Sequence, residues 1–309
     1  MTADRTLVHV HNHTLGKNTA WTASLPTLAA NGYRMLLQIH DFPEDFRPEA
    51  YRSLIASLAH GRPAELPRWL YPQARQIHYA VLNGRDHAVL ADAGVAPSNL
   101  HHLPNPVTGP GPLPNRHEAR QQLAVHFGVP AEGRLVLYPV RGIRRKNLGE
   151  LLLWSAMDGH TSYGVTLSPL NVLEQPSYQR WQRLAKERRL PVVFGLGEQG
   201  GLSLPQNLAA ADALITTSVA EGFGMVFLES WLAGCPLIGR DLPEITADYL
   251  RQGLQFPWLA PRLVVPLSWL ADLASFRRRW VDRVKRVLSD YGQPDPPLNL
   301  LQQGFDRLT

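Results

Sequence analysis

Short apolar runs alternate with longer amphipathic stretches along this 309-residue chain. Short runs of this kind are typical of buried strands, and strands separated by helices must pair in parallel. The pattern therefore predicts an α/β protein with doubly wound parallel sheets. In the first half, strands are expected over 6–11, 35–39 and 77–82, with helices over 20–30 and 48–60. In the second half, a helix over 115–127 precedes strands over 135–140, 163–167, 191–194, 213–216 and 236–238, each followed by a helix.

A proline-rich stretch divides the two halves. Residues 103–115 contain five prolines and two glycines, which cannot continue a helix or a central strand. We therefore expect two Rossmann-like domains, 1–115 and 116–309, that face each other across a cleft. Ligands of such folds usually bind beside the carboxyl ends of the strands.

Composition narrows the class of protein. With 44% hydrophobic and 18% charged residues the chain is globular, and it contains neither an 18-residue apolar run nor the apolar core of a signal peptide. The single cysteine, Cys235, is typical of a reducing cytoplasm, where we expect the protein to reside. The net charge of +5 favours anionic partners without naming them. Arginine, the dominant cation, suits phosphate, although a genomic bias towards arginine would give the same composition.

The segment 221–229 reads Glu-Gly-Phe-Gly-Met-Val-Phe-Leu-Glu and carries the clearest chemistry. It follows a predicted strand, turns through two glycines and enters a helix at about Met225. Helix starts present unpaired N–H groups and a partial positive charge, and glycine lets a ligand approach the backbone, which suits a sugar diphosphate. Glu221 precedes the helix, where it can accept hydrogen bonds from sugar hydroxyls. Glu229 lies about one turn inside it, where it can hold two ribose hydroxyls.

A basic loop follows the first strand of the second half. Arg141, Arg144, Arg145 and Lys146 place four cations within six residues, which repel one another unless an anion lies among them. We expect Arg144 and Arg145 to be exposed loop charges.

These two segments resemble the retaining glycosyltransferases of family 4, also called glycosyl transferases group 1, which have the GT-B fold. The resemblance consists of E-G-F-G-x4-E followed by G-x-P, and of R-x4-K in the basic loop, where Asn147 replaces the usual glycine. It implies a nucleotide-sugar co-substrate, no metal, retention of anomeric configuration and proton removal by the donor phosphate. Arg141 and Lys146 would hold the diphosphate. The remaining residues that the resemblance assigns to catalysis or donor binding are Glu221, Gly222, Phe223, Gly224, Met225, Val226 and Glu229.

Histidines mark the first half. His9, His11 and His13 alternate along a predicted strand and should share one face. The family has a comparable H-x-H histidine near the transferred sugar, so the resemblance assigns catalysis to His11, with His13 as second choice, and donor binding to His40. His9 is expected to pack in the core.

Several alternatives stay open. The family has further strand–helix units before its H-x-H segment, which begins here at residue 9. The first domain is therefore shortened, and the missing part is cut from this sequence, supplied by a second chain or dispensed with. The acceptor is a saccharide, a lipid-linked molecule or a small molecule, and no nucleic acid is expected. The basic amphipathic helix over 275–288 packs on its domain or lies on the inner face of a membrane.

Three other classes compete. Residues 195–200 match G-x-G-x-x-G, which would suit a dinucleotide-dependent oxidoreductase, although Ser203 and Pro205 interrupt the expected helix. The first-half histidines would suit a metal-dependent hydrolase. The chain could also bind a sugar nucleotide without catalysis, or form one subunit of a split enzyme.

Overall fold

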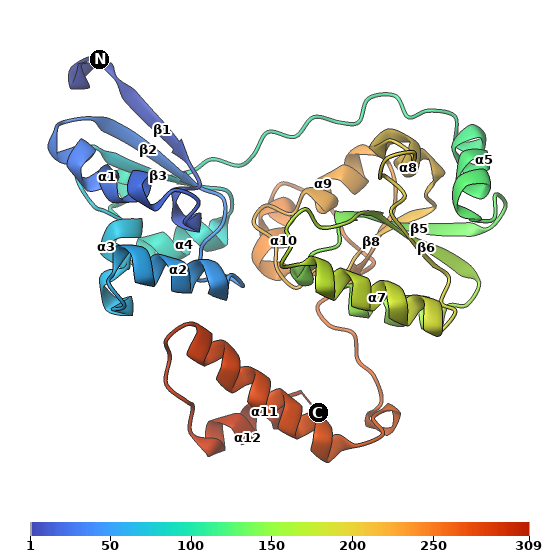
Figure 1. Cartoon of the computed structure of the whole chain (residues 1–309). Helices are drawn as coiled ribbons and strands as arrows, with labels where there is room; N and C mark the ends of the chain where they lie inside the picture. The colour runs from blue at the N-terminus through green and yellow to red at the C-terminus, as the bar shows by residue number, and fades with distance from the viewer. Residues whose placement is uncertain (1, 309) are drawn as a thin grey trace. The chain divides into compact units, whose positions relative to one another are not determined.

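The computed structural model describes residues 2–308, which divide into two compact units (Figure 1). The first unit contains the residues up to Pro104 together with those from Val264 onwards, and the second is Asn105–Leu263. The segment after Val264, which the sequence-based division assigns to the second domain, is grouped with the first unit. Its Tyr291 hydroxyl accepts a hydrogen bond from the backbone N–H of Arg47 (2.8 Å).

The first unit is built on a four-stranded parallel sheet of order β1-β2-β3-β4. One face forms the core with α1 and α4, where Val10, Leu37 and Tyr79 of the strands meet Leu25 and Leu90 of the helices. The strands are β1 (Leu7–His11), β2 (Arg34–Ile39), β3 (Ile77–Val81) and β4 (Leu100–His102), and the helices are α1 (Thr19–Ala30), α2 (Pro48–Leu58), α3 (Pro67–Leu70) and α4 (Gly84–Asp92).

Two C-terminal helices, α11 (Leu273–Asp290) and α12 (Leu298–Asp306), complete this unit. The apolar side of α11 packs on α12, where the rings of Phe276 and Trp280 lie 5.9 and 5.7 Å from that of Phe305. The amphipathic helix expected over 275–288 therefore uses its apolar side within the fold. Among residues 2–308, no helix has both the length and the apolar content needed to cross a bilayer.

The second unit contains a six-stranded parallel sheet of order β10-β9-β8-β5-β6-β7. Its strands are β5 (Arg134–Arg141), β6 (Thr161–Leu167), β7 (Val192–Phe194), β8 (Ala213–Thr216), β9 (Leu237–Arg240) and β10 (Leu259–Ala260). Its helices are α5 (Arg116–Phe127), α6 (Leu148–Met157), α7 (Gln175–Glu187), α8 (Leu204–Ala210), α9 (Met225–Leu232) and α10 (Pro243–Arg251). Short 3₁₀ helices in the two units are η1 (Ala3–Arg5), η2 (His13–Leu15), η3 (Pro63–Glu65), η4 (Pro97–Asn99), η5 (Arg144–Lys146) and η6 (Leu267–Trp269).

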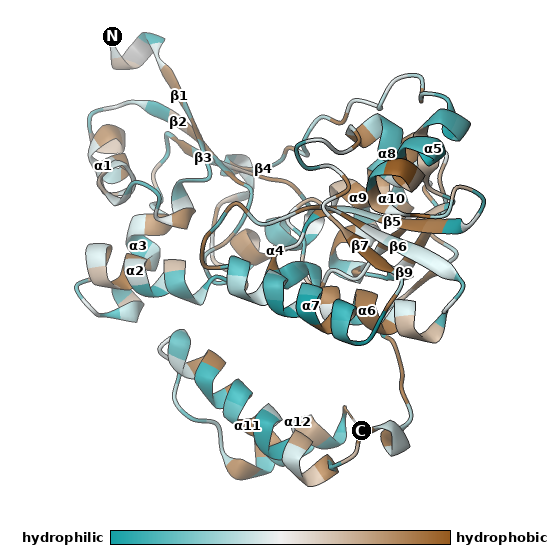
Figure 2. Ribbon diagram, turned by 45° about the vertical axis from the view of Figure 1, so that its right-hand side comes forward, coloured by the Kyte–Doolittle hydropathy of each residue, from teal (hydrophilic) through white to brown (hydrophobic). Residues whose placement is uncertain are grey.

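Helices pack on both faces of this second sheet. One face forms a core with α5, α8, α9 and α10, and the other with α6 and α7. Figure 2 shows the contrast between the last two, since α6 is largely brown whereas α7 exposes a hydrophilic, teal side. The predicted architecture of two parallel α/β domains, with the smaller sheet first, is confirmed.

The order in which strands are added to this sheet reverses at β5. It runs from β5 outwards through β6 to β7, crosses back to β8 on the other side of β5, and continues to β9 and β10. The loops that leave the carboxyl ends of β5 and β8 therefore diverge to opposite faces. Such a topological switch point is where open parallel sheets bind their ligands.

Candidate active site

A buried ion pair occupies the switch point of the second unit. The Nζ of Lys146, at the end of η5 after β5, pairs with Oε1 of Glu221 in the loop after β8. The two side chains are only 12% and 6% exposed. Arg145 approaches the other oxygen of the same carboxylate, with Nη1 at 3.9 Å. Burial lowers the pKa of the Lys146 ammonium, while the Glu221 carboxylate acts in the opposite direction.

The hydroxyl groups of Ser218 and Tyr138 lie beside this ion pair. Ser218 donates a hydrogen bond to the Glu221 carboxylate (2.6 Å), and its Oγ lies 2.7 Å from the hydroxyl of Tyr138 on β5. Tyr138 is fully buried, which raises the pKa of its phenol. The neutral hydroxyl also donates to the carbonyl of Lys146 (3.1 Å). The buried carboxylate is therefore held by one neutral donor, Ser218, in addition to the Lys146 ammonium.

Backbone contacts join the two loops directly. The hydroxyl of Thr217 donates to the carbonyl of Lys146 (2.9 Å), and the N–H of Val219 donates to the carbonyl of Arg145 (2.9 Å). Because these bonds link the loops after β5 and β8, the positions of Lys146 and Glu221 are fixed by the sheet.

Asn147, where the chain departs from the family pattern, has a left-handed backbone with φ +49° and ψ +53°. Glycine adopts this region at no steric cost, and asparagine is among the few other residues that visit it routinely. The substitution therefore keeps the turn that places Lys146 before α6. The Asn147 side chain also donates to Glu150 in the first turn of that helix (2.9 Å).

The E-G-F-G turn delivers the chain into α9. Gly224 has φ +79°, and a Cβ at this position would lie 2.6 Å from the ring of Phe227. The carbonyl of Phe223 accepts a hydrogen bond from the hydroxyl of Tyr249 on α10, which ties the turn to that helix. Met225 is 38% exposed, whereas the side chain of Val226 is 4% exposed in the core.

The other predicted donor residues of this unit lie around the pair. Glu229 on α9 is half-buried, and burial raises the pKa of its carboxyl while the charge of Lys146 lowers it. Arg141 is exposed at the end of β5, where it donates to the carbonyl of Ser168 after β6 (3.2 Å). Arg144 is exposed and ion-paired with Glu174 (3.2 Å), as expected for a loop charge. The same expectation is wrong for Arg145, whose side chain is only 27% exposed because it turns towards Glu221. Lys146, Glu221 and Glu229 thus form one electrostatic group, with Arg141 beside it on the same sheet edge.

The first unit brings His11 and His40 together at the ends of β1 and β2. Nδ1 of His11 lies 3.2 Å from Nε2 of His40. The side-chain oxygen of Asn12 accepts the backbone N–H groups of His40 and Asp41 (3.2 and 3.1 Å), which fixes the end of β2. Burial and the neighbouring His11 lower the pKa of His40. The two histidines predicted from separate sequence segments therefore share one small site.

Two histidine expectations are wrong. His13 does not share a face with His9 and His11, because β1 ends at His11 and the left-handed Asn12 turns the chain into η2. His13 is 5% exposed, its Nε2 lies 2.8 Å from the carbonyl of Leu70, and burial lowers its pKa to about 4. His9 is exposed rather than packed in the core, and its Nε2 lies 3.0 Å from Oε1 of Gln38.

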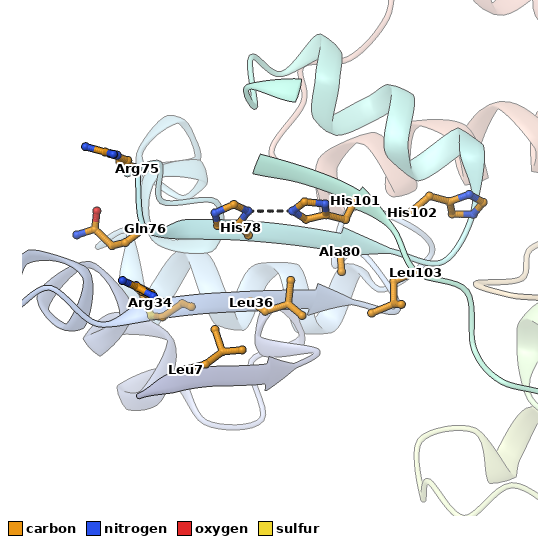
Figure 3. Close-up of a pocket in the computed structure, with 11 residues that line it drawn as sticks. Leu7, Arg34, Leu36, Arg75, Gln76, His78, Ala80, His101, His102 and Leu103 are labelled. Carbon is orange, nitrogen blue, oxygen red and sulfur yellow. Dashed lines mark hydrogen bonds between the residues drawn. The ribbon is translucent and has the colours of Figure 1, made fainter. Parts of the chain in front are cut away.

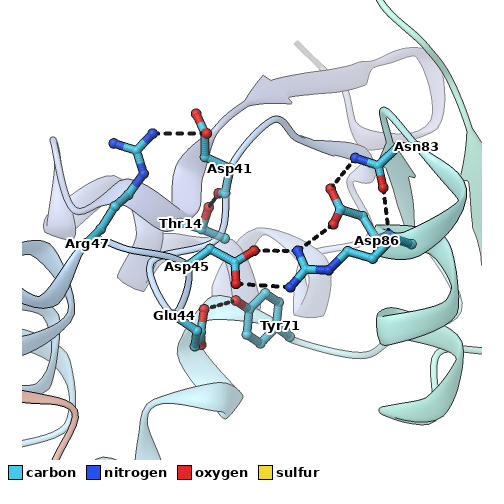
Figure 4. A network of polar contacts seen from close by, with 9 residues as sticks. Thr14, Asp41, Glu44, Asp45, Arg47, Tyr71, Asn83 and Asp86 are labelled. Carbon is cyan, nitrogen blue, oxygen red and sulfur yellow. Dashed lines mark hydrogen bonds and ion pairs between the residues drawn. The ribbon is translucent and has the colours of Figure 1, made fainter. Parts of the chain in front are cut away.

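A polar network that the sequence did not predict rigidifies the loops after β2 and β3 (Figure 4). Arg85 donates to both carboxylate oxygens of Asp45 and also pairs with Asp86 (3.0 Å). The hydroxyl of Tyr71 donates to Glu44 (2.9 Å), whose pKa is raised by burial. These acids are engaged within the fold, and the loop that begins at His40 is held in place by them.

Residues 129–261 match the family model described as glycosyl transferases group 1. A curated relative, mannosylglucosyl-3-phosphoglycerate synthase of Petrotoga mobilis, is 29% identical over 234 residues, which are 74% of this chain and 45% of the relative. The chain thus spans less than half of that protein's length. Sucrose-phosphate synthase from Thermosynechococcus elongatus has a TM-score of 0.58 at 19% identity, over 98% of this chain and 68% of the other. Anabaena HepE in complex with UDP-glucose has a TM-score of 0.59 at 16% identity, over 97% and 77%. These similarities show the GT-B fold.

The segment that matches glycosyl transferases group 1 contains the ion pair and α9, whereas His11 and His40 lie outside it. Among the described residues of both units, no group of three or more His, Cys, Asp or Glu side chains is arranged to hold a metal ion.

The G-x-G-x-x-G stretch does not lead directly into a helix, as it would in a dinucleotide-binding oxidoreductase. It forms a loop after β7, and α8 begins only at Leu204, with Ser203 and Gln206 as a capping box and Pro205 in the first turn. Ser203 and Pro205 therefore begin a helix rather than interrupt one. Two strands, β5 and β6, separate β7 and this loop from β8 and the Glu221 turn.

Proposed function

We propose that the chain is a retaining glycosyltransferase that moves a sugar from a nucleotide-sugar donor to an acceptor hydroxyl. One observation carries the proposal: the Lys146–Glu221 pair lies at the switch point of the second sheet, beside the N-termini of α6 and α9. A cation, a carboxylate and two helix N-termini at one sheet edge suit a ligand with both phosphates and hydroxyls.

Each group has a distinct role in this proposal. Lys146 and Arg141 neutralise the charge that grows on the departing diphosphate, and the amides at the start of α9 bind its oxygens. Glu221 accepts hydrogen bonds from hydroxyls of the transferred sugar once the donor phosphate takes over part of its contact with Lys146. Glu229 holds the ribose hydroxyls. His11 is assigned to catalysis and His40 to donor binding, as the resemblance implies.

Proton removal needs no strong protein base in such a transfer. The acceptor hydroxyl attacks the anomeric carbon from the face that the diphosphate leaves, and a phosphate oxygen takes the hydroxyl proton. Electrostatic stabilisation of the leaving group is then the main contribution of the protein. The site requires no metal, because Lys146, Arg141 and the α9 amides supply the positive charge.

The comparisons guide the choice of donors to test. HepE was solved with UDP-glucose, and the name of the Petrotoga relative includes a mannosyl and a glucosyl group. We therefore propose UDP-glucose and GDP-mannose as first candidates, with an ADP-sugar in the same panel. A ligand that binds only the folded state raises the melting temperature in proportion to its affinity, so thermal shift identifies the nucleotide before an acceptor is known.

The deciding experiment compares two lysine variants. Lys146→Ala should lower kcat/KM for donor hydrolysis and transfer by about 10²–10³, while the fold is retained. Lys186→Ala, at an exposed position on α7 of the same unit, should leave turnover unchanged. Wild-type turnover in Lys146→Ala would exclude the proposed site, and thermal shift without turnover in the wild-type chain would indicate a sugar-nucleotide binder.

A further inference from the structure

Among the described residues of the first unit, no helix packs on one face of the four-stranded sheet. Side chains alternate along each strand, so the residues opposite the core point away from α1 and α4. Most of them line a hollow of about 720 Å³, shown in Figure 3. Every lining residue belongs to a strand or lies within two positions of one, and Met35, whose side chain is buried in the core, is the exception to the outward direction. The lining residues are Leu7, Arg34, Met35, Leu36, Arg75, Gln76, His78, Ala80, His101, His102 and Leu103.

Parallel sheets are normally covered on both faces. In the second unit this holds, because cores form on both sides of its sheet. In the first unit, α2, α3 and α4 lie on one side of the sheet in both views (Figures 1 and 2), and the core residues of α1 lie on that side too. The hollow face nevertheless exposes apolar side chains, with Leu7 66% and Leu103 41% accessible. This face therefore leaves apolar surface in water where a parallel sheet is usually covered.

The edge of the same sheet is also open. Within the described chain, β1 pairs with β2 on one side and is the first strand of the sheet order. An edge strand presents a row of backbone N–H and C=O groups that accepts another strand. A partner that reaches the hollow from this side therefore gains both backbone pairing and apolar burial.

The charges around the hollow specify the chemistry of that partner. Arg34 and Arg75 flank it, His78 and His101 stack within it at 5.1 Å, and no lining residue is acidic. Two copies joined face to face would bring these arginines and histidines together without any carboxylate to neutralise them. An acidic surface is complementary instead.

We propose that this face and the β1 edge bind a separate polypeptide, which pairs a strand in parallel with β1 and lays an amphipathic helix, apolar with Asp or Glu at its margins, across the hollow. The partner supplies the layer that would complete a two-sided sheet. This interface is independent of the Lys146–Glu221 site, so each can fail without the other.

Photocrosslinking in cells that express the chain natively tests the interface. p-Benzoylphenylalanine is introduced in place of Leu36, inside the hollow, or in place of Leu170, which is 78% exposed in the second unit. We expect one polypeptide to be captured from the Leu36 position and not from the Leu170 position. Capture of a second copy alone, of lipid alone, or of nothing above the Leu170 background would overturn the proposal.

The captured polypeptide must then bind in the proposed way. Purified and mixed with the full chain, it should slow hydrogen exchange of the β1 amides at least about tenfold, because an edge strand becomes paired. Arg34→Glu together with Arg75→Glu should raise Kd by roughly tenfold or more, whereas Arg278→Glu together with Arg279→Glu, exposed on α11, should not. Unchanged exchange of β1, or equal Kd values for both double variants, would show that the capture was incidental.

Discussion

Lys146 and Glu221 are 75 residues apart in the sequence, yet their side chains form an ion pair at the adjoining ends of β5 and β8. Neighbouring strands place the two loops side by side, and the Thr217 hydroxyl and the Val219 N–H join them. Because both side chains are buried, each depends on the other for neutralisation. A phosphate ligand that approaches Lys146 therefore competes with Glu221.

Removal of the Glu221 carboxylate should destabilise the ligand-free protein. Glu221→Gln leaves the Lys146 ammonium, which is 12% exposed, without its main partner. An unpaired buried charge costs about 3–5 kcal/mol, and we expect about 3 kcal/mol because Lys146 keeps some contact with water. Urea denaturation measures this loss, with the exposed Glu187→Gln as control. UDP should stabilise the variant more than the wild type, and equal stabilisation of both would contradict the competition.

The left-handed turn at Asn147 should tolerate glycine and little else. Asn147→Gly should change the free energy of unfolding by less than about 1 kcal/mol, since glycine adopts φ +49° freely but loses the bond to Glu150. Asn147→Val should cost at least about 2 kcal/mol, because a β-branched residue is strained in this region. Thermal or urea unfolding of both variants checks this. Similar stability of the two would mean that the turn relaxes.

Gly224 should be sensitive to a single methyl group. An alanine Cβ would lie 2.6 Å from the ring of Phe227, in addition to the strain at φ +79°. Gly234 is the matched control, since it has φ +62° with no atom within 4 Å of the added Cβ. We expect Gly224→Ala to cost about 1–3 kcal/mol more than Gly234→Ala, and to weaken donor binding. Equal costs would show that backbone strain alone decides both.

His13 should make the protein less stable in mild acid. Its pKa is about 4 in the folded chain against an ordinary value of 6.5, so the unfolded chain binds the proton first as the pH falls. Stability from this group is present above pH 6.5, is lost between pH 6.5 and about 4, and changes no further below that. The loss is roughly 3 kcal/mol.

The substitution His13→Gln removes the titrating group but keeps a hydrogen-bond donor for the Leu70 carbonyl. Wild-type stability should therefore fall by roughly 3 kcal/mol more than that of His13→Gln across this pH interval. The exposed His126→Gln serves as control and should follow the wild type. Parallel pH curves for all three proteins would refute a neutral buried His13.

Patterns within one strand or one turn were readable from the sequence, and contacts between segments were not. The apolar runs predicted β5 and β8, and the E-G-F-G turn predicted the start of α9. The predicted doubly wound sheet implied that β8 lies on the far side of β5, but no local pattern indicated the Lys146–Glu221 ion pair that this order makes possible. Strand order depends on the packing of whole elements, so it leaves no local signal.

The histidines illustrate a second limit. Alternation along a strand predicts a shared face only while the strand continues, and the chain leaves β1 one residue after His11. Asn12 at φ +57° was the available signal, because asparagine favours left-handed turns. Short β4 and β10 were missed as well, since three or two residues carry no periodicity.

The first unit is discontinuous in sequence, and this affects the order of folding. Its strands precede residues 105–263, whereas α11 and α12, including the Tyr291 hydroxyl that binds the Arg47 backbone, follow them. The intervening residues 105–263 form a contiguous unit that can fold on the ribosome as soon as it emerges. During synthesis, the second unit can therefore reach its final form before the first unit, which waits for α11 and α12 to be made.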